Sequence, residues 1–190
     1  MYAAVFWSGT DDRKVAQRIL PCIPDDFHGK ILDVQAGTAV LTERKWRSLK
    51  HAQITCLDYS RDMLKQAEQR LSDCPHIAFV QGDAADLSMP DETYDLVISM
   101  NGFHAFSDKQ KAFSEMQRVL KPGGLFTGCF YIRGKSGITD FLVNHVLSRK
   151  GWFTPPFQTE VQVREILQNN YSQVRIEIDG SILLFHCRKR

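Results

Sequence analysis

"ILDVQAGTAVLT", residues 31–42, begins as an apolar run and continues into a turn around Gly37. We predict a buried strand, a turn and then a helix over 39–50. Such a turn usually cradles a nucleotide-like cofactor, because backbone N–H groups and the helix N-terminus can receive a negative or polar group. Turns of this kind are normally rich in glycine, yet Gln35 and Ala39 stand where flexible residues are expected. The stretch therefore raises the question of whether a cofactor still binds, and which one.

Outward from this stretch, short apolar runs alternate with helical patterns. The predicted strands are 30–34, 53–59, 77–81, 94–100, 125–132, 172–179 and 181–189. The predicted helices are 11–20 between an N-cap at Thr10 and a stop at Pro21, 39–50, one capped by Ser60, one after Ser107 that ends at 121–124, and one to about 169 opened by a Thr159–Gln162 capping box.

This alternation predicts an α/β fold with a mostly parallel sheet and helices on both faces. The last two strands meet at Asp179-Gly180, which favours an antiparallel hairpin and makes the sheet mixed. In an open parallel sheet, ligands bind beyond the carboxyl ends of the strands. The loops that follow the predicted strands are therefore the candidate site.

Composition restricts the function classes. The chain has 190 residues, which suits one domain, and a formal net charge of +2, which gives no case for nucleic acid as a partner. No run approaches the roughly 20 apolar residues of a membrane span, and the N-terminus lacks the basic start of a secretion signal. The five cysteines form no CxxC pair. We therefore expect reduced cysteines, a cytoplasmic protein and no metal site.

Two acidic residues follow predicted strands at informative positions. Asp58 ends the second strand 21 positions after Gly37, where an acid usually holds ribose hydroxyls. Asp83 follows the third strand and could accept a hydrogen bond from an adenine amino group. A nicotinamide fingerprint would need glycine at 35, 37 and 40, but Gln35 and Val40 are present. A nicotinamide oxidoreductase is therefore a weak alternative.

Four stretches occur in order at characteristic spacings: "ILDVQAGTA", "ITCLDYSRDMLKQA", "VQGDAADLSMPDETYDLVISMNGFHAF" and "RVLKPGG". Together they resemble class I S-adenosylmethionine-dependent methyltransferases. The chain is most similar to the small-molecule group (methyltransferase type 11) related to ubiquinone/menaquinone-biosynthesis enzymes, closely over residues 30–130. The resemblance implies a Rossmann-like seven-stranded sheet in the order 3-2-1-4-5-7-6, with strand 7 antiparallel.

The resemblance also implies a set of residues that bind S-adenosylmethionine. These are Asp33, Gly37 and Met100 for the methionine part, Asp58 for the ribose hydroxyls, and Tyr59, Met63, Asp83 and the Ala84 N–H for the adenine. Met63 also belongs to a helical apolar stripe with Leu64, Ala67 and Leu71, so core packing explains it equally well. Asp33 could instead brace the turn.

The resemblance further implies one methyltransferase domain over 1–190. We divide it into an N-terminal helix and lid (1–29), a cofactor-binding core (30–132), an acceptor-side insert (133–157) and a C-terminal helix and hairpin (158–190). Two aromatic stretches, "AAVFWSG" (3–9) and "KGWFTPPF" (150–157), could each fold over the cleft as an apolar lid. The alternative is a satellite core cluster beneath a loop.

The expected reaction is in-line methyl transfer to a small-molecule acceptor, with an aromatic or apolar acceptor preferred. His104 is the leading candidate for a general base, with Tyr131 and His145 behind it, and the alternative is that His104 is a structural or surface histidine. The rival hypothesis is a non-catalytic relative whose cofactor binding Gln35 and Ala39 have weakened or abolished. If Gln35 needs a positive φ, the strain is about 1 kcal/mol or more.

Overall fold

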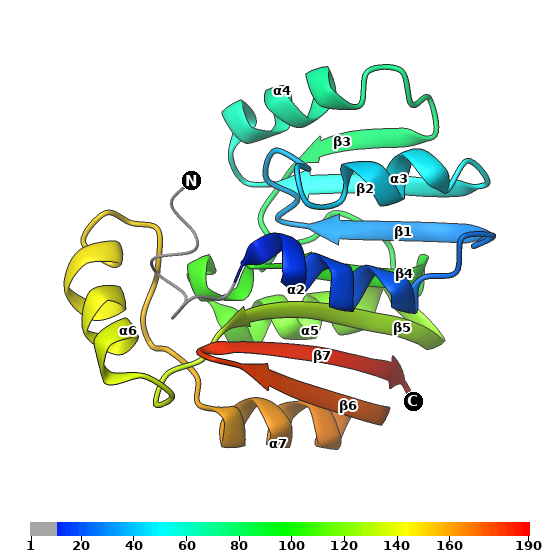
Figure 1. The fold of residues 1–190 in the computed structure, drawn as a ribbon. Helices are drawn as coiled ribbons and strands as arrows, with labels where there is room; N and C mark the ends of the chain where they lie inside the picture. Colours follow the sequence, from blue (N-terminus) through cyan, green and yellow to red (C-terminus); the bar gives the residue numbers. More distant parts are fainter. Residues whose placement is uncertain (1–10) are drawn as a thin grey trace.

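The computed structural model describes residues 11–190, which form one seven-stranded sheet in the order β3-β2-β1-β4-β5-β7-β6 (Figure 1). The predicted strand order is confirmed. Every neighbouring pair from β3 to β5 is parallel, and β7 runs antiparallel to both β5 and β6. The strands are β1 (Gly29–Val34), β2 (Ala52–Asp58), β3 (Ile77–Gln81), β4 (Tyr94–Met100), β5 (Leu120–Tyr131), β6 (Tyr171–Asp179) and β7 (Ile182–Lys189).

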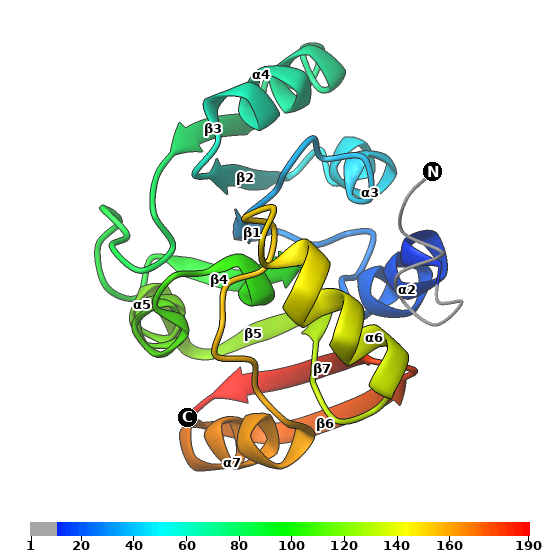
Figure 2. The ribbon, with the colours of Figure 1, turned by 90° about the vertical axis from the view of Figure 1, so that its left-hand side faces the viewer.

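Helices cover both faces of the sheet (Figure 2). One layer holds α2 (Asp12–Ile19), α3 (Glu43–Ser48) and α4 (Arg61–Arg70), and the other holds α5 (Lys109–Val119) and α7 (Glu160–Asn170). Beyond the carboxyl end of β5 stands α6 (Gly137–Leu142), which continues as the π-helix η3 (Val143–Leu147). The described residues also form two short 3-10 helices, η1 (Leu20–Cys22) and η2 (Phe103–Ala105). Within residues 11–190, none of the helices has the length and apolarity that a bilayer crossing requires.

The central strands are buried on both faces, as a covered parallel sheet requires. On β1, Ile31 belongs to the apolar cluster under α2 and α3, while Leu32 belongs to the cluster under α5 and α7. Successive strand side chains point to opposite faces, so one continuous apolar run serves two cores. The polar positions of the central strands are thereby confined mainly to their ends, where the site is built.

The prediction of a helix over 39–50 is wrong at its start. The backbone of Ala39 has a φ of 56°, in the left-handed region, and α3 begins only at Glu43. A left-handed residue cannot continue a right-handed helix. Residues 36–42 are therefore a loop. Thr42 is the N-cap residue of α3, but its side chain makes no capping hydrogen bond.

Other boundaries shift by smaller amounts. The predicted cap Thr10 and the aromatic stretch 3–9 lie outside the described residues, and the carboxylate of Asp11 caps α2 by accepting from the N–H of Arg13 at 2.9 Å. Asp108, not Ser107, caps α5. That helix ends at Val119, and 121–124 belongs to an out-of-register stretch of β5.

The predicted hairpin turn and the two remaining predicted helix caps agree more closely with the structure. Asp179 pairs with Ile182, so the hairpin turn lies one position later than predicted. The Ser60 cap is confirmed, because its hydroxyl accepts from the N–H of Met63 at 3.4 Å. The Thr159–Gln162 capping box is also confirmed.

Candidate functional site

A cavity of about 420 Å³ lies at the carboxyl ends of β1, β2 and β4. This volume is within the range of about 300–1,000 Å³ for small-molecule sites. Four chain segments line it: the loop after β1, the turn from β2 into α4, the turn from β4 into η2, and residues 151–152. The lining residues are Asp33, Gln35, Ala36, Gly37, Thr38, Val40, Leu41, Thr42, Asp58, Ser60, Met63, Met100, Asn101, His104, Ala105, Gly151 and Trp152.

The loop after β1 is strained. Gln35, Gly37 and Ala39 have φ values of 59°, 58° and 56°. The condition stated for strain at Gln35, a positive φ, is therefore met, and Ala39 shares it. Each non-glycine residue in this region costs about 1 kcal/mol or more, and such conformations persist only where the surroundings enforce them.

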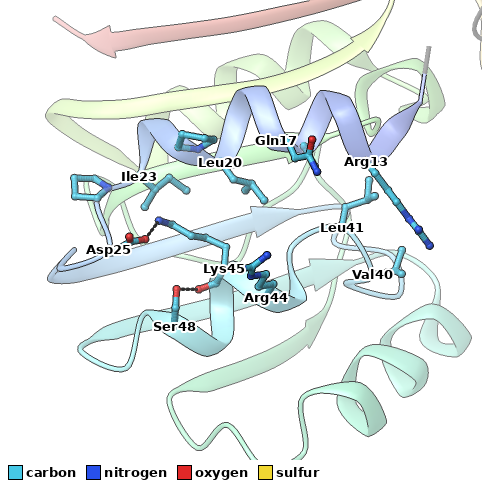
Figure 3. A pocket seen from close by; sticks show the side chains of 13 residues that line it. Arg13, Gln17, Leu20, Ile23, Asp25, Val40, Leu41, Arg44, Lys45 and Ser48 are labelled. Carbon is cyan, nitrogen blue, oxygen red and sulfur yellow. Dashed lines mark hydrogen bonds and ion pairs between the residues drawn. The ribbon is translucent and has the colours of Figure 1, made fainter. Parts of the chain in front are cut away.

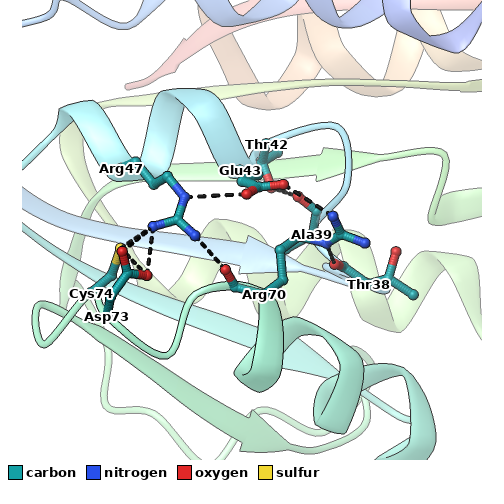
Figure 4. Close-up of polar contacts among 8 residues, drawn as sticks. All are labelled: Thr38, Ala39, Thr42, Glu43, Arg47, Arg70, Asp73 and Cys74. Atoms are coloured by element: carbon teal, nitrogen blue, oxygen red, sulfur yellow. Dashed lines mark hydrogen bonds and ion pairs between the residues drawn. The ribbon is translucent and has the colours of Figure 1, made fainter.

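Contacts from β2 and α4 hold this loop in place, and Figure 4 shows those made by Arg70 of α4. The N–H of Gly37 donates to Oδ2 of Asp58 at 2.8 Å. From the end of α4, Arg70 donates its Nε–H to the carbonyl oxygen of Thr38 at 2.9 Å and pairs with Glu43 at 3.1 Å. No sequence pattern pointed to Arg70, since it lies 32 positions from Thr38.

Asp33 braces the loop from below. Its Oδ2 accepts from the indole Nε1–H of Trp46 at 2.9 Å and from the hydroxyl of Thr42 at 3.3 Å. The side chain is buried, and burial raises its pKa to about 7 despite those two hydrogen bonds. Asp33 thus ties β1 to α3, which supports the bracing alternative. Trp46 was missed, although a single tryptophan within the charged stretch "ERKWRS" marks an inward-facing position.

Asp58 is buried at the end of β2 and lines the cavity. Its Oδ1 accepts from the N–H of Ser60 at 2.8 Å, while Oδ2 holds the N–H of Gly37. Each carboxylate oxygen has a second lone pair. Asp58 can therefore accept hydrogen bonds from a ligand while it keeps both backbone donors.

The other predicted cofactor residues divide into two groups. Met63 and Met100 line the cavity, and Met63 is 44% exposed, so the core-packing alternative is wrong for it. Tyr59, Asp83 and Ala84 do not line the cavity. The ring of Tyr59 is 73% exposed, and the carboxylate of Asp83 accepts from the N–H of Ala85 at 2.8 Å.

His104 lies in the cavity wall on η2. It is buried and stacks on Phe153, with ring centroids 4.0 Å apart. Burial, with a smaller effect of the Lys109 charge, lowers its pKa to about 3, so the imidazole is neutral at physiological pH. Of the weaker candidates, Tyr131 donates its hydroxyl to Asp140 at 2.6 Å and burial raises its pKa, while His145 is exposed and lies outside the cavity lining.

Within the stretch 150–157, some residues behave as the predicted lid and others as the predicted satellite core cluster. Trp152 is 53% exposed and lines the cavity with Gly151, as a lid would. Phe153 and Phe157 are buried against the ring of Tyr131, with centroids 5.7 and 5.6 Å from it, as a satellite core would be. The stretch therefore forms a cavity wall anchored by its own aromatic residues.

Polar contacts fasten this wall to η2. The N–H of Thr154 donates to the carbonyl of His104 at 2.8 Å, and its hydroxyl donates to the carbonyl of Ala105 at 3.1 Å. The buried ammonium of Lys109 donates to the carbonyls of Phe106 and Thr154. Two segments almost 50 positions apart thus act as one wall.

Asn101 marks the end of β4 and was also missed. Its φ is 58°, and its amide Nδ2 donates to Asp12 on α2 at 3.1 Å, while its Oδ1 accepts from the thiol of Cys129 at 3.5 Å. This side chain joins α2, β4 and β5 beside the cavity. An asparagine directly before a glycine was its only signal, since asparagine tolerates left-handed backbone.

A second cavity, of about 850 Å³, runs between α2 and α3 (Figure 3). Leu20, Ile23 and Leu41 give it apolar walls, and an ion pair of 2.6 Å between Lys45 and Asp25 lies at its edge. Val40 and Leu41 line both cavities. The loop after β1 is thus the partition between the two hollows.

Comparison with known proteins assigns these features to a family. A family model described as a methyltransferase domain matches residues 31–124. Demethylmenaquinone methyltransferase of Thermotoga maritima is 36% identical over 113 residues, which are 60% of this chain and 48% of the relative. Malonyl-[acyl-carrier protein] O-methyltransferase of Geobacter sulfurreducens is 35% identical over 127 residues, 66% of this chain and 45% of the relative. The chain spans about half the length of the curated relatives it matches.

The fold has a close structural counterpart. Phosphoethanolamine N-methyltransferase 2 of Haemonchus contortus, solved in complex with S-adenosyl-L-methionine, superposes with a TM-score of 0.77 at 16% identity. The superposition covers 93% of this chain and 52% of that one. At this identity the likeness establishes the shared fold.

Proposed function

Because the chain belongs to the class I S-adenosylmethionine-dependent methyltransferases, we propose that it binds S-adenosylmethionine in the 420 Å³ cavity and methylates a small-molecule acceptor. The observation that carries the proposal is the convergence of the loops after β1, β2 and β4 on this cavity, with the Asp58 carboxylate facing it. When bound, the cofactor would supply a methyl group activated by its bond to a sulfonium, and the sulfur would leave as a neutral thioether when the acceptor attacks the methyl carbon. No metal is needed in this proposal.

The residues present fit such a ligand. Asp58 keeps free lone pairs for the two ribose hydroxyls, and Met63 offers an exposed apolar surface to the adenine. We propose that Tyr59, Asp83 and the Ala84 N–H border the adenine from outside the present cavity lining. Gly37 and Met100 would bracket the methionine part, and Asp33 acts through the loop that it braces.

For an in-line displacement the protein contributes mainly alignment and exclusion of water. The wall of Gly151 and Trp152, fastened by Thr154 and Lys109, closes one side of the cavity. His104 stays our proposed proton acceptor. Because burial holds its pKa near 3, it is a weak base, so we expect its removal to cost less than the 10²–10⁴-fold that is typical of general bases.

We propose an aromatic or apolar small-molecule acceptor, since the exposed indole of Trp152 borders the site. The two curated relatives differ in the acceptor that their names give, so family membership leaves the acceptor open. The net charge of +2 gives no support to nucleic acid, and the five free cysteines suit a reducing, cytoplasmic compartment.

Calorimetric titration with S-adenosylhomocysteine tests the proposal. We expect binding, and we expect Asp58→Ala to weaken it by about 1.5–3 kcal/mol, the range for hydrogen bonds to a charged group. Asp62→Ala, which removes an exposed carboxylate on α4, is the matched control. Absence of heat at millimolar ligand would favour the non-catalytic relative, and equal affinity of both variants would remove Asp58 from the site.

Transfer itself is tested with S-adenosylmethionine labelled in its methyl group. A panel of aromatic and apolar small molecules is incubated with the protein, and label in any product identifies an acceptor class. Cofactor binding without transfer to any of them would contradict the preference for aromatic or apolar acceptors.

A further inference from the structure

Gln35 places an amide side chain at a position of the cofactor loop where glycine is normally expected and would leave the cavity open. We propose that this side chain is a specificity residue, whose amide oxygen accepts an N–H of the ammonium group on the amino-acid half of the cofactor. The inference rests on the proposed function and goes further, because it assigns ligand recognition to a side chain rather than to the loop backbone.

The Gln35 side chain lies at the carboxyl ends of the central strands. Gln35 directly follows β1, and a Cβ built on Gly102, just beyond β4, would lie 3.1 Å from its Cβ and 3.3 Å from its Oε1. The amide therefore reaches from the end of β1 to the end of β4. Its backbone φ of 59° fixes this direction at the cavity wall.

The arrangement of polar groups orients the ligand. Asp58 stands at the β2 side of the cavity, and a carboxylate at the end of the second strand suits the two donor hydroxyls of a ribose. The adenosine half then occupies the β2 side. The amino-acid half extends toward β4, where Gln35, Met100 and Asn101 line the wall.

At that end, Oδ2 of Asp33 and both ends of the Asn101 amide already have partners, whereas Oδ1 of Asp33 accepts no hydrogen bond from residues 11–190. Oδ2 of Asp33 holds Trp46 and Thr42, and the two ends of the Asn101 amide hold Asp12 and Cys129. Oε1 of Gln35 is buried and accepts no hydrogen bond from residues 11–190.

A buried acceptor without a donor is unfavourable, and turning it toward an incoming donor breaks no existing hydrogen bond. An ammonium group brings three N–H donors. Binding of an amino-acid ligand would therefore satisfy the amide and stabilise the complex, whereas a ligand without the ammonium would leave the amide as it is.

The test compares two ligands by calorimetry: S-adenosylhomocysteine, and 5′-methylthioadenosine, which lacks the amino-acid half. Gln35→Met keeps the side-chain length and the strained backbone but removes the amide. We expect it to weaken S-adenosylhomocysteine binding about tenfold or more and to change 5′-methylthioadenosine binding less than twofold. Gln173→Gly, which relieves similar strain on β6 at a residue outside the cavity lining, should leave both affinities unchanged.

Gln35→Gly distinguishes recognition from obstruction, because it opens the wall completely. We expect it to weaken S-adenosylhomocysteine as Gln35→Met does. Tighter binding of that ligand to Gln35→Gly would show that the side chain obstructs the site, which overturns the inference and leaves the cofactor site intact. Equal changes for the two ligands would also overturn it. If no protein, wild type included, binds either ligand, both the inference and the proposed function fail.

Discussion

Asp33→Asn is the most direct test of the brace beneath the cofactor loop. The native carboxyl is buried, and its Oδ2 accepts from Trp46 and Thr42. An asparagine carboxamide oxygen can accept the same two hydrogen bonds and carries no titratable proton. The variant therefore keeps the contacts and removes only the ionisation.

The expected effect of pH follows from the pKa of Asp33, which burial raises from 3.8 to about 7. Between these values the unfolded chain is ionised while the folded protein keeps its proton, so unfolding releases a proton and stability falls as pH rises. The contribution is fully present below about pH 4 and is lost as pH rises toward 7. Three pKa units at 1.36 kcal/mol each give about 4 kcal/mol between pH 4 and pH 8.

Urea unfolding of both proteins, measured from pH 4 to pH 8 without ligand, reads out this difference. We expect the stability of Asp33→Asn relative to wild type to rise by about 4 kcal/mol across the range, and Asp62→Asn, at an exposed position, to show no comparable trend. A pH-independent difference would contradict the buried, proton-bearing Asp33, and a decrease would contradict its sign.

Three further variants test the supports of the site by urea unfolding. Arg70→Met frees a carbonyl of the cofactor loop and should cost about 1–3 kcal/mol, whereas Arg61→Met, which breaks only an exposed ion pair on the same helix, should cost less than about 1 kcal/mol; equal losses would remove Arg70 from the loop's support. Gly102→Ala places a methyl 2.5 Å from a buried serine hydroxyl and should cost about 1–3 kcal/mol, while the methyl of Gly137→Ala meets no atom of residues 11–190 within 4 Å and should be tolerated. Thr159→Ala removes a capping box and should cost about 1 kcal/mol, and a loss near zero would show that the cap contributes nothing.

The sheet was predictable because each parallel strand is a short apolar run that a covered sheet must bury. The runs 77–81 and 94–100 match β3 and β4 at both ends. The helix expected over 39–50 failed at its start because distant residues hold the loop before Ala39: Asp58 accepts from Gly37, and Arg70 donates to Thr38. Local propensity does not register such contacts.

The candidate site, like the fold, was predictable only in part. Topology brings Gly37, Asp58 and Met100 together, since the carboxyl ends of neighbouring parallel strands meet at one edge. The partners that shape these residues were not predictable, because Trp46 and Arg70 reach the loop from other helices. Whether an exposed residue such as Asp83 turns into the cavity also depends on loop geometry that the sequence pattern does not specify.

The cavity wall beside His104 is formed by the end of a segment that is fastened at two places. The segment after β5 is tied down early, where Tyr131 donates to Asp140, and again late, where Thr154 bonds to η2. Between these two ties, Val143 and Leu147 are buried in the core, whereas Phe141 and Val146 are exposed, so side chains at the exposed positions can change while both ties stay in place. Under the proposed function, substitutions at these exposed positions would change the acceptor side of the cavity, while the loops after β1 and β2 would keep their contacts with the methyl donor.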